Sequence, residues 1–94
     1  MINIQYRITS NTNINFLLND INVQFQVNLY DNRTDIVQIE IFKDGLLYMK
    51  SDFFSNPTQT HFIIGLNTTI SCSYDESSAE FLFYIQSEED YIEV

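Results

Sequence analysis

Residues 21–29 decide the fold class, and they read Ile-Asn-Val-Gln-Phe-Gln-Val-Asn-Leu. Apolar side chains occupy every odd position, and neutral polar side chains occupy every even position. Because successive side chains of a strand point to opposite faces, this alternation predicts a β-strand with one buried and one solvated face. The polar row consists of Asn22, Gln24, Gln26 and Asn28. A helix, with its longer repeat, does not produce such a pattern.

Shorter alternating segments lie on both sides of this strand. Further strands are expected over residues 2–8, 14–18, 36–42, 46–50, 61–66, 69–74 and 79–86. Asn19-Asp20 and Asp44-Gly45 suit the positive φ angles of tight hairpin turns. Residues 51–60, which contain the only proline, are expected to form a surface loop or a crossover. About eight strands at this spacing predict an all-β fold, either a small antiparallel β-sandwich or a barrel.

Length and composition are those of one domain with a hydrophobic core. The chain has 94 residues, of which 45% are hydrophobic and 15% aromatic. Seven of the 13 acidic residues, and none of the four basic ones, fall within residues 75–94. We therefore expect a single β domain over residues 1–86 and an acidic C-terminal tail over residues 87–94. Because nucleic-acid binding depends on Lys and Arg, the few basic residues argue against direct binding to DNA or RNA.

Candidate reactive groups are few. Cys72 is the single cysteine, so it forms no intrachain disulfide and is expected to be a small buried strand residue. His61, the single histidine, is expected at the exposed start of a strand, and no nucleophile signature accompanies it. The carboxylates at residues 75–76 and 88–90 lack the spacing of a calcium-binding loop. The sequence therefore predicts no enzyme, no metal site and no cofactor.

Targeting signals are also not evident in the sequence. No apolar run approaches the ~20 residues of a membrane helix, and residues 1–4 lack the basic start and apolar core of a signal peptide. We therefore expect a protein made in a cytoplasm that does not bind membranes.

Two features stand out as candidate interfaces. They are the row Asn22, Gln24, Gln26 and Asn28, and the tail residues Glu88, Glu89, Asp90 and Tyr91. A row of uncharged amides presents donors and acceptors without the charges that blunt pairing, and it is typical of a solvated sheet face or a polar protein interface. The tail is either a solvated acidic segment or one that adds to a sheet edge or docks on a partner.

One stretch of the chain resembles a known family. Residues 16–21 (Phe-Leu-Leu-Asn-Asp-Ile) lead into the long alternating strand, which ends at 29–33 (Leu-Tyr-Asp-Asn-Arg). Residues 36–45 then return as a strand that ends in Lys-Asp-Gly. This order of a polar turn, a long strand, an Asn-Arg turn and a returning strand resembles that of the small baseplate plug proteins of contractile-tailed bacteriophages. The likeness covers about residues 14–50.

The resemblance implies a non-enzymatic structural protein of the virion. Such a protein is made in the host cytoplasm and plugs or adapts the distal end of the tail tube by packing against tube, hub or baseplate proteins. A homo-oligomer within the particle is also expected, because the apolar surplus within residues 36–54 indicates strands covered on both faces and favours burial against neighbouring subunits. The acidic balance leaves an alternative of another class, a small phage-encoded inhibitor that mimics DNA and binds a basic host defence protein. A carbohydrate-binding module, with tyrosines as stacking platforms, is a third possibility.

Overall fold

The structure is a computed structural model that describes residues 2–93. These residues form nine β-strands, one short 3-10 helix and no α-helix, so the predicted all-β class is confirmed. The elements are β1 (Ile2–Ile8), β2 (Thr12–Leu18), β3 (Ile21–Leu29), β4 (Ile36–Lys43), β5 (Leu46–Phe54), β6 (Thr60–Ile63), η1 (Ile64–Leu66), β7 (Thr68–Asp75), β8 (Glu80–Ser87) and β9 (Tyr91–Glu93).

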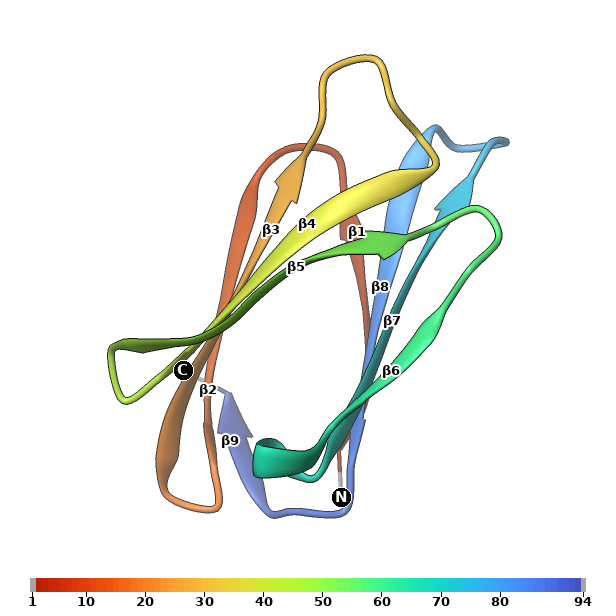
Figure 1. Ribbon diagram of the computed structural model, residues 1–94. Helices are drawn as coiled ribbons and strands as arrows, with labels where there is room; N and C mark the ends of the chain where they lie inside the picture. Colours follow the sequence, from red (N-terminus) through yellow and green to blue (C-terminus); the bar gives the residue numbers. More distant parts are fainter. Residues whose placement is uncertain (1, 94) are drawn as a thin grey trace.

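The strands form two antiparallel sheets that face each other (Figure 1). The first sheet has the order β1-β8-β7-β6, and the second has the order β5-β4-β3-β2-β9. Strands β2 to β5 follow one another as a meander, and the chain then crosses to the first sheet. Because the two sheets are separate, the fold is a sandwich, which resolves the choice between sandwich and barrel.

The alternating strand β3 lies in the middle of the second sheet and supplies the centre of the core. Val23, Phe25 and Val27 are at most 2% exposed. The ring of Phe25 lies 5.5 Å from that of Phe16 on β2 and 5.8 Å from that of Phe83 on β8, measured between centroids. Phe25 thus joins both sheets, and the predicted inward face of residues 21–29 is confirmed.

The two predicted hairpin turns are confirmed. Asn19 and Asp20 have φ angles of 49° and 65°, and Asp44 and Gly45 have φ angles of 50° and 81°. Positive φ at both central residues is the geometry of a type I′ turn, whose twist matches that of the strands it connects. Asn, Asp and Gly tolerate this region better than other residues do, which is why the turns fall where they do.

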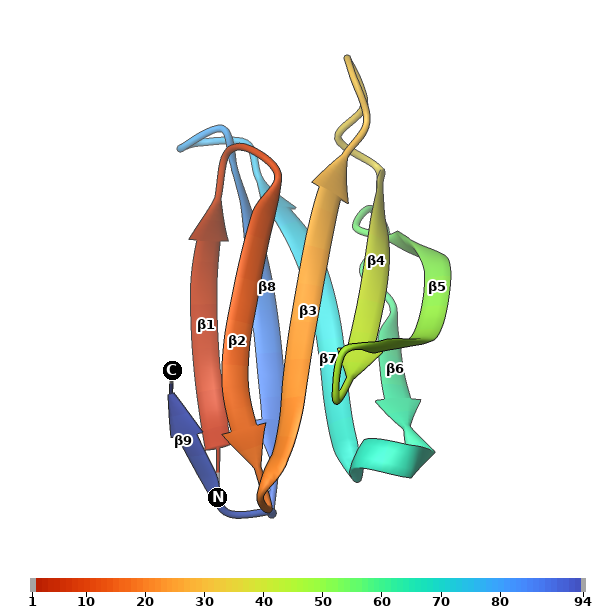
Figure 2. The same cartoon turned by 90° about the vertical axis from the view of Figure 1, so that its left-hand side faces the viewer.

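Strand β5 is longer than predicted, so the expected loop over residues 51–60 is wrong for its first four residues. The strand continues to Phe54, and Phe53 is buried in the core. Ile41 pairs with Met49 but Phe42 pairs with Leu47, so β5 has one extra residue, Tyr48. This bulge shifts the inside-outside alternation of β5, and Figure 2 shows the strand bending along one margin of the molecule.

The expected tail contains a strand. Residues 91–93 form β9, which pairs with the outer edge of β2 and places Tyr91 opposite Leu18. At the turn before it, the Asn19 amide N–H donates to the carbonyl oxygen of Asp90 at 2.7 Å. The ring of Tyr91 meets that of Phe16 edge to face, with centroids 6.5 Å apart. Val94 lies outside the described residues.

Candidate protein interface

The outer face of the second sheet is covered by uncharged amides, and we call it the amide surface. Its members are Asn13 and Asn15 on β2, Asn22, Gln24, Gln26 and Asn28 on β3, and Gln38 on β4. The antiparallel register places Asn13 beside Gln26 and Asn15 beside Gln24. It also places Gln38 beside Asn28. The predicted row is therefore the middle of a wider surface formed by three neighbouring strands.

One half of the amide surface is held by its own hydrogen bonds. The Asn28 Nδ2 donates to Glu40 Oε1 at 2.8 Å and, more weakly, to Gln38 Oε1 at 3.4 Å. Asn28 Oδ1 in turn accepts from Gln26 Nε2 at 3.2 Å. These bonds fix the side chains of this half, so a partner meets a rigid pattern of polar atoms rather than freely rotating amides.

The other half of the amide surface is less occupied. The Gln24 side chain is only partly exposed, yet its amide has no hydrogen-bond partner within residues 2–93. A hollow of about 230 Å³ lies next to it and is lined by Asn15, Asn22, Gln24, Phe42 and Gly45, among others. An aromatic wall with a free amide beside it is suited to receiving one side chain of a partner protein.

The four candidate residues of the tail do not act as one group. Glu88 lines a separate hollow beside Asn3 and Phe62 of the first sheet. The Glu89 carboxylate accepts a hydrogen bond from Asn67 Nδ2 at 3.2 Å. The ring of Tyr91, as described above, points inward. The structure therefore does not bring the acidic tail residues onto the amide surface.

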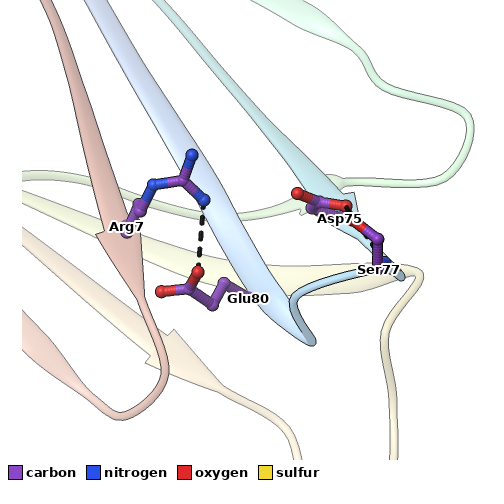
Figure 3. A network of polar contacts seen from close by, with 4 residues as sticks. All are labelled: Arg7, Asp75, Ser77 and Glu80. Carbon is purple, nitrogen blue, oxygen red and sulfur yellow. Dashed lines mark hydrogen bonds and ion pairs between the residues drawn. The ribbon is translucent and has the colours of Figure 1, made fainter.

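Asp75, Glu76 and Glu80 lie at the other end of β8, whereas Glu93 belongs to β9. Figure 3 shows Arg7 Nη1 paired with Glu80 Oε1 at 3.1 Å, and Asp75 beside Ser77. The Ser77 hydroxyl donates to Asp75 Oδ1 at 2.7 Å, and such bonds from Ser77 and Ser78 lower the pKa of Asp75. Strand β8 has eight residues, so it separates this group from Glu88 by roughly 25 Å. The acidic residues thus form two groups rather than one row.

A second exposed feature is the side of the sandwich where β5 and β6 form the free edges, and we call it the open side. Six of the eight large apolar side chains that are exposed among the described residues belong to the elements of this side, β5, β6 and η1: Leu46, Leu47, Tyr48, Phe54, Phe62 and Ile64. They border the edge from both sheets, since Leu47 lies opposite Phe42 on the second sheet and Phe62 lies beside Asn3 and Glu88 on the first. Tyr48 lies over Gly65, where its hydroxyl occupies the space that a Cβ would need. Lys43 Nζ in turn lies 5.6 Å from the centre of the Tyr48 ring.

His61 closes the open side next to β5, so its expected exposure is wrong. It faces the core opposite Ile70, and its ring stacks on Phe53 with centroids 3.9 Å apart and planes 24° from parallel. Its Nε2 atom is buried without a hydrogen-bond partner among the described residues. The sequence showed only a polar residue beside a loop. The extension of β5 to Phe53, which creates the stack, was not predicted.

Substitutions at His61 test this packing. We expect His61→Phe to unfold at the same or a higher denaturant concentration, because it keeps the stack and removes an unpaired polar atom. We expect His61→Ala to lose about 1–2 kcal/mol, since it removes the stack. Urea titrations of both variants measure the difference. A His61→Phe variant less stable than His61→Ala would contradict the described environment.

Cys72 is buried at the centre of β7, as predicted. Burial raises the pKa of its thiol from 9.0 to about 12. Between these pH values the unfolded chain loses the thiol proton and the folded chain does not, so alkali favours unfolding. We expect native Cys72 to resist thiol reagents and stability to fall above pH 9.0 by at most about 1.4 kcal/mol per pH unit. Cys72→Ala should lack this part of the pH dependence in urea titrations.

These features define an all-β sandwich whose candidate interfaces lie on its exposed surfaces. Within residues 2–93, no group of three or more His, Cys, Asp and Glu is arranged to hold a metal ion. No helix in that range is long and apolar enough to cross a membrane. No protein-family model, curated protein or solved structure matches the chain.

Proposed function

We propose that this chain is a non-enzymatic structural subunit that acts by packing against other protein chains, and that its assembly is the baseplate end of a phage tail. The resemblance over residues 14–50 supports the phage context. In that setting the protein plugs or adapts the distal end of the tail tube, and its partners are tube, hub or baseplate proteins.

The observation that carries the proposal is the apolar open side. Ile64 is 84% exposed, Leu46 75% and Leu47 54%, within a chain of 94 residues. Single exposed apolar side chains are ordinary, but a group on one side of a small domain is typical of a protein interface. The amide surface adds a second face that is mostly uncharged and polar, with Glu40 as the charged neighbour of Asn28.

Charged substitutions on the amide surface test this function. We expect Gln24→Lys with Gln26→Lys to leave the free energy of unfolding within about 0.5 kcal/mol of the parent, because both positions face outward. We expect the same variant to be missing from purified particles, since two added ammonium groups would be desolvated in the interface, and Glu40, opposite Gln26, can pair with only one of them. Mass spectrometry of virions, relative to the tail-tube protein, measures incorporation.

Thr9→Lys with Ser10→Lys is the matched control. It adds the same two charges at an exposed turn that is not part of the amide surface. Particles that contain the control but lack the amide-surface variant would support the proposal. Finding no parent protein in virions, with abundant protein in infected cells, would refute the structural role and favour the acidic inhibitor.

A further inference from the structure

Strand β5 is a free sheet edge with available backbone groups. It is the first strand of the second sheet, and within residues 2–93 it pairs with β4 alone. At the end of β5, the Ser55 amide N–H points to the β4 side and donates to the Asp35 carbonyl at 2.8 Å. The carbonyl of the preceding residue, Phe54, points to the opposite side and accepts from the Gln59 amide N–H at 3.2 Å. Residues of an antiparallel strand direct their N–H and C=O groups to alternate sides. The backbone groups of Lys50 and Asp52 therefore point away from β4, toward the free edge.

The side chains at this edge carry opposite charges two residues apart. Lys50 and Asp52 are both exposed and lie on the outer face of the sheet. The ammonium of Lys50 has no ion-pair partner within residues 2–93, whereas the guanidinium groups of Arg7 and Arg33 are paired with Glu80 and Asp35. Asp52 accepts a hydrogen bond from the hydroxyl of Tyr30, which follows β3, so in the single chain its carboxylate is turned across β4.

Only a few registers are open to two copies of β5 that pair antiparallel about a two-fold axis. An axis at Lys50 places two ammonium groups opposite each other, and an axis at Asp52 does the same with two carboxylates. An axis at Ser51 places Lys50 of each copy opposite Asp52 of the other. Directly opposed unlike charges stabilise a strand pair and like charges destabilise it, so the charges select the Ser51 register.

The same register suits the backbone groups at the edge. Lys50 and Asp52, whose backbone groups point outward, become the hydrogen-bonded pairs of the new ladder, while Ser51 meets itself at a non-hydrogen-bonded position. The regular part of the ladder ends before Tyr48, because Tyr48 is the extra residue of the bulge and its ring lies over Gly65.

We infer that the chain forms a symmetric dimer in which two β5 strands pair antiparallel about Ser51 and join the two five-stranded sheets into one. The partner is a second copy of this chain. The joined sheet places two amide surfaces side by side on one face. The inference does not depend on the phage context, because a purified protein forms this dimer without any other tail protein.

A cysteine at the two-fold axis tests the register directly. In a non-hydrogen-bonded antiparallel pair the two Cα atoms lie about 4.5 Å apart, which is within the range of a disulfide. We expect Ser51→Cys to convert almost fully to a disulfide-linked dimer under mild oxidation. Ser77→Cys, exposed in the β7–β8 turn, is the matched control and should remain mostly unlinked. The native Cys72 is buried and does not compete.

Charge exchange tests the selection of the register. Lys50→Asp places carboxylates opposite each other at both ends of the ladder, and we expect it to weaken dimerisation at least about tenfold. Lys50→Asp combined with Asp52→Lys restores unlike charges and should restore the dimer. Sedimentation equilibrium measures the mass, which is twice 11.1 kDa for the dimer. If Lys50→Asp acted by damaging the fold, the double variant, which carries the same change, would also fail to dimerise. Recovery of the dimer in the double variant therefore shows that the single variant acts through the charges between the strands.

A monomeric parent protein at its highest soluble concentration would overturn the inference. A folded Ser51→Cys variant that remains unlinked would do the same. In either case Lys50 and Asp52 serve instead as charges that protect the edge from pairing. Neither result bears on incorporation into virions, so failure of the dimer and failure of the proposed function remain distinguishable.

Discussion

Phe25→Ala is expected to cost about 3–5 kcal/mol of unfolding free energy, the largest loss of any single substitution considered for this chain. Phe25 is 0% exposed and its ring contacts Phe16 in its own sheet and Phe83 in the other. The cavity left by the ring lies between the two sheets, where neither can collapse inward without moving the other. Domains of this size are stable by about 5–15 kcal/mol, so a large part of the stability is lost.

Urea titration followed by circular dichroism measures this loss. Phe25→Leu keeps most of the apolar volume and should cost less than about 2 kcal/mol. Gln24→Ala is the matched control on the opposite face of β3, and its change should stay within about 0.5 kcal/mol. Equal losses for Phe25→Ala and Gln24→Ala would show that β3 does not have one buried and one solvated face.

The local parts of this fold are predictable from the sequence because they depend on neighbouring residues. The alternation of residues 21–29 determines which face of β3 is buried, and this needs no knowledge of the partner strands. The turns at Asn19-Asp20 and Asp44-Gly45 follow from the few residues that accept positive φ. Both are properties of short segments, and both were predicted.

The parts that were missed depend on contacts between distant residues. Residues 51–60 contain the only proline and break the alternation, so the sequence predicts a loop there, although β5 continues to Phe54 and Phe53 is buried. The stack between Phe53 and His61 joins two sheets and has no local signal. The width of the amide surface depends in the same way on the register that places Asn15 beside Gln24.

The C-terminal segment illustrates the difference most clearly. The sequence leaves two outcomes open, because Glu88, Glu89 and Asp90 are a block of like charges typical of a solvated tail, while the residues after them can add to a sheet edge. Residues 91–93 form β9, since the edge of β2 offers unpaired backbone groups and Phe16 offers an apolar contact. Composition alone does not distinguish a solvated tail from an edge strand. The pairing of residues 91–93 with β2 in the structure does.

Substitution of Tyr91 tests whether this strand stabilises the sandwich. We expect Tyr91→Ala to cost about 2 kcal/mol, because it removes the edge-to-face contact with Phe16 and exposes part of the core beneath β9. Ile92→Ala is the matched control in the same strand. Its side chain is 63% exposed on the outer face, so the change should stay within about 0.5 kcal/mol.

The comparison separates an ordered strand from a solvated tail. In a solvated tail, Tyr91 and Ile92 are both surrounded by water, and neither substitution changes the free energy of unfolding. In the sandwich, successive side chains of β9 point to opposite faces, so only Tyr91→Ala has an effect. Hydrogen exchange adds an independent measurement: the amide of Asn19, which donates to the Asp90 carbonyl at 2.7 Å, should exchange faster in Tyr91→Ala than in Ile92→Ala. Equal exchange and equal stability in the two variants would remove β9 from the folded unit and leave the edge of β2 free.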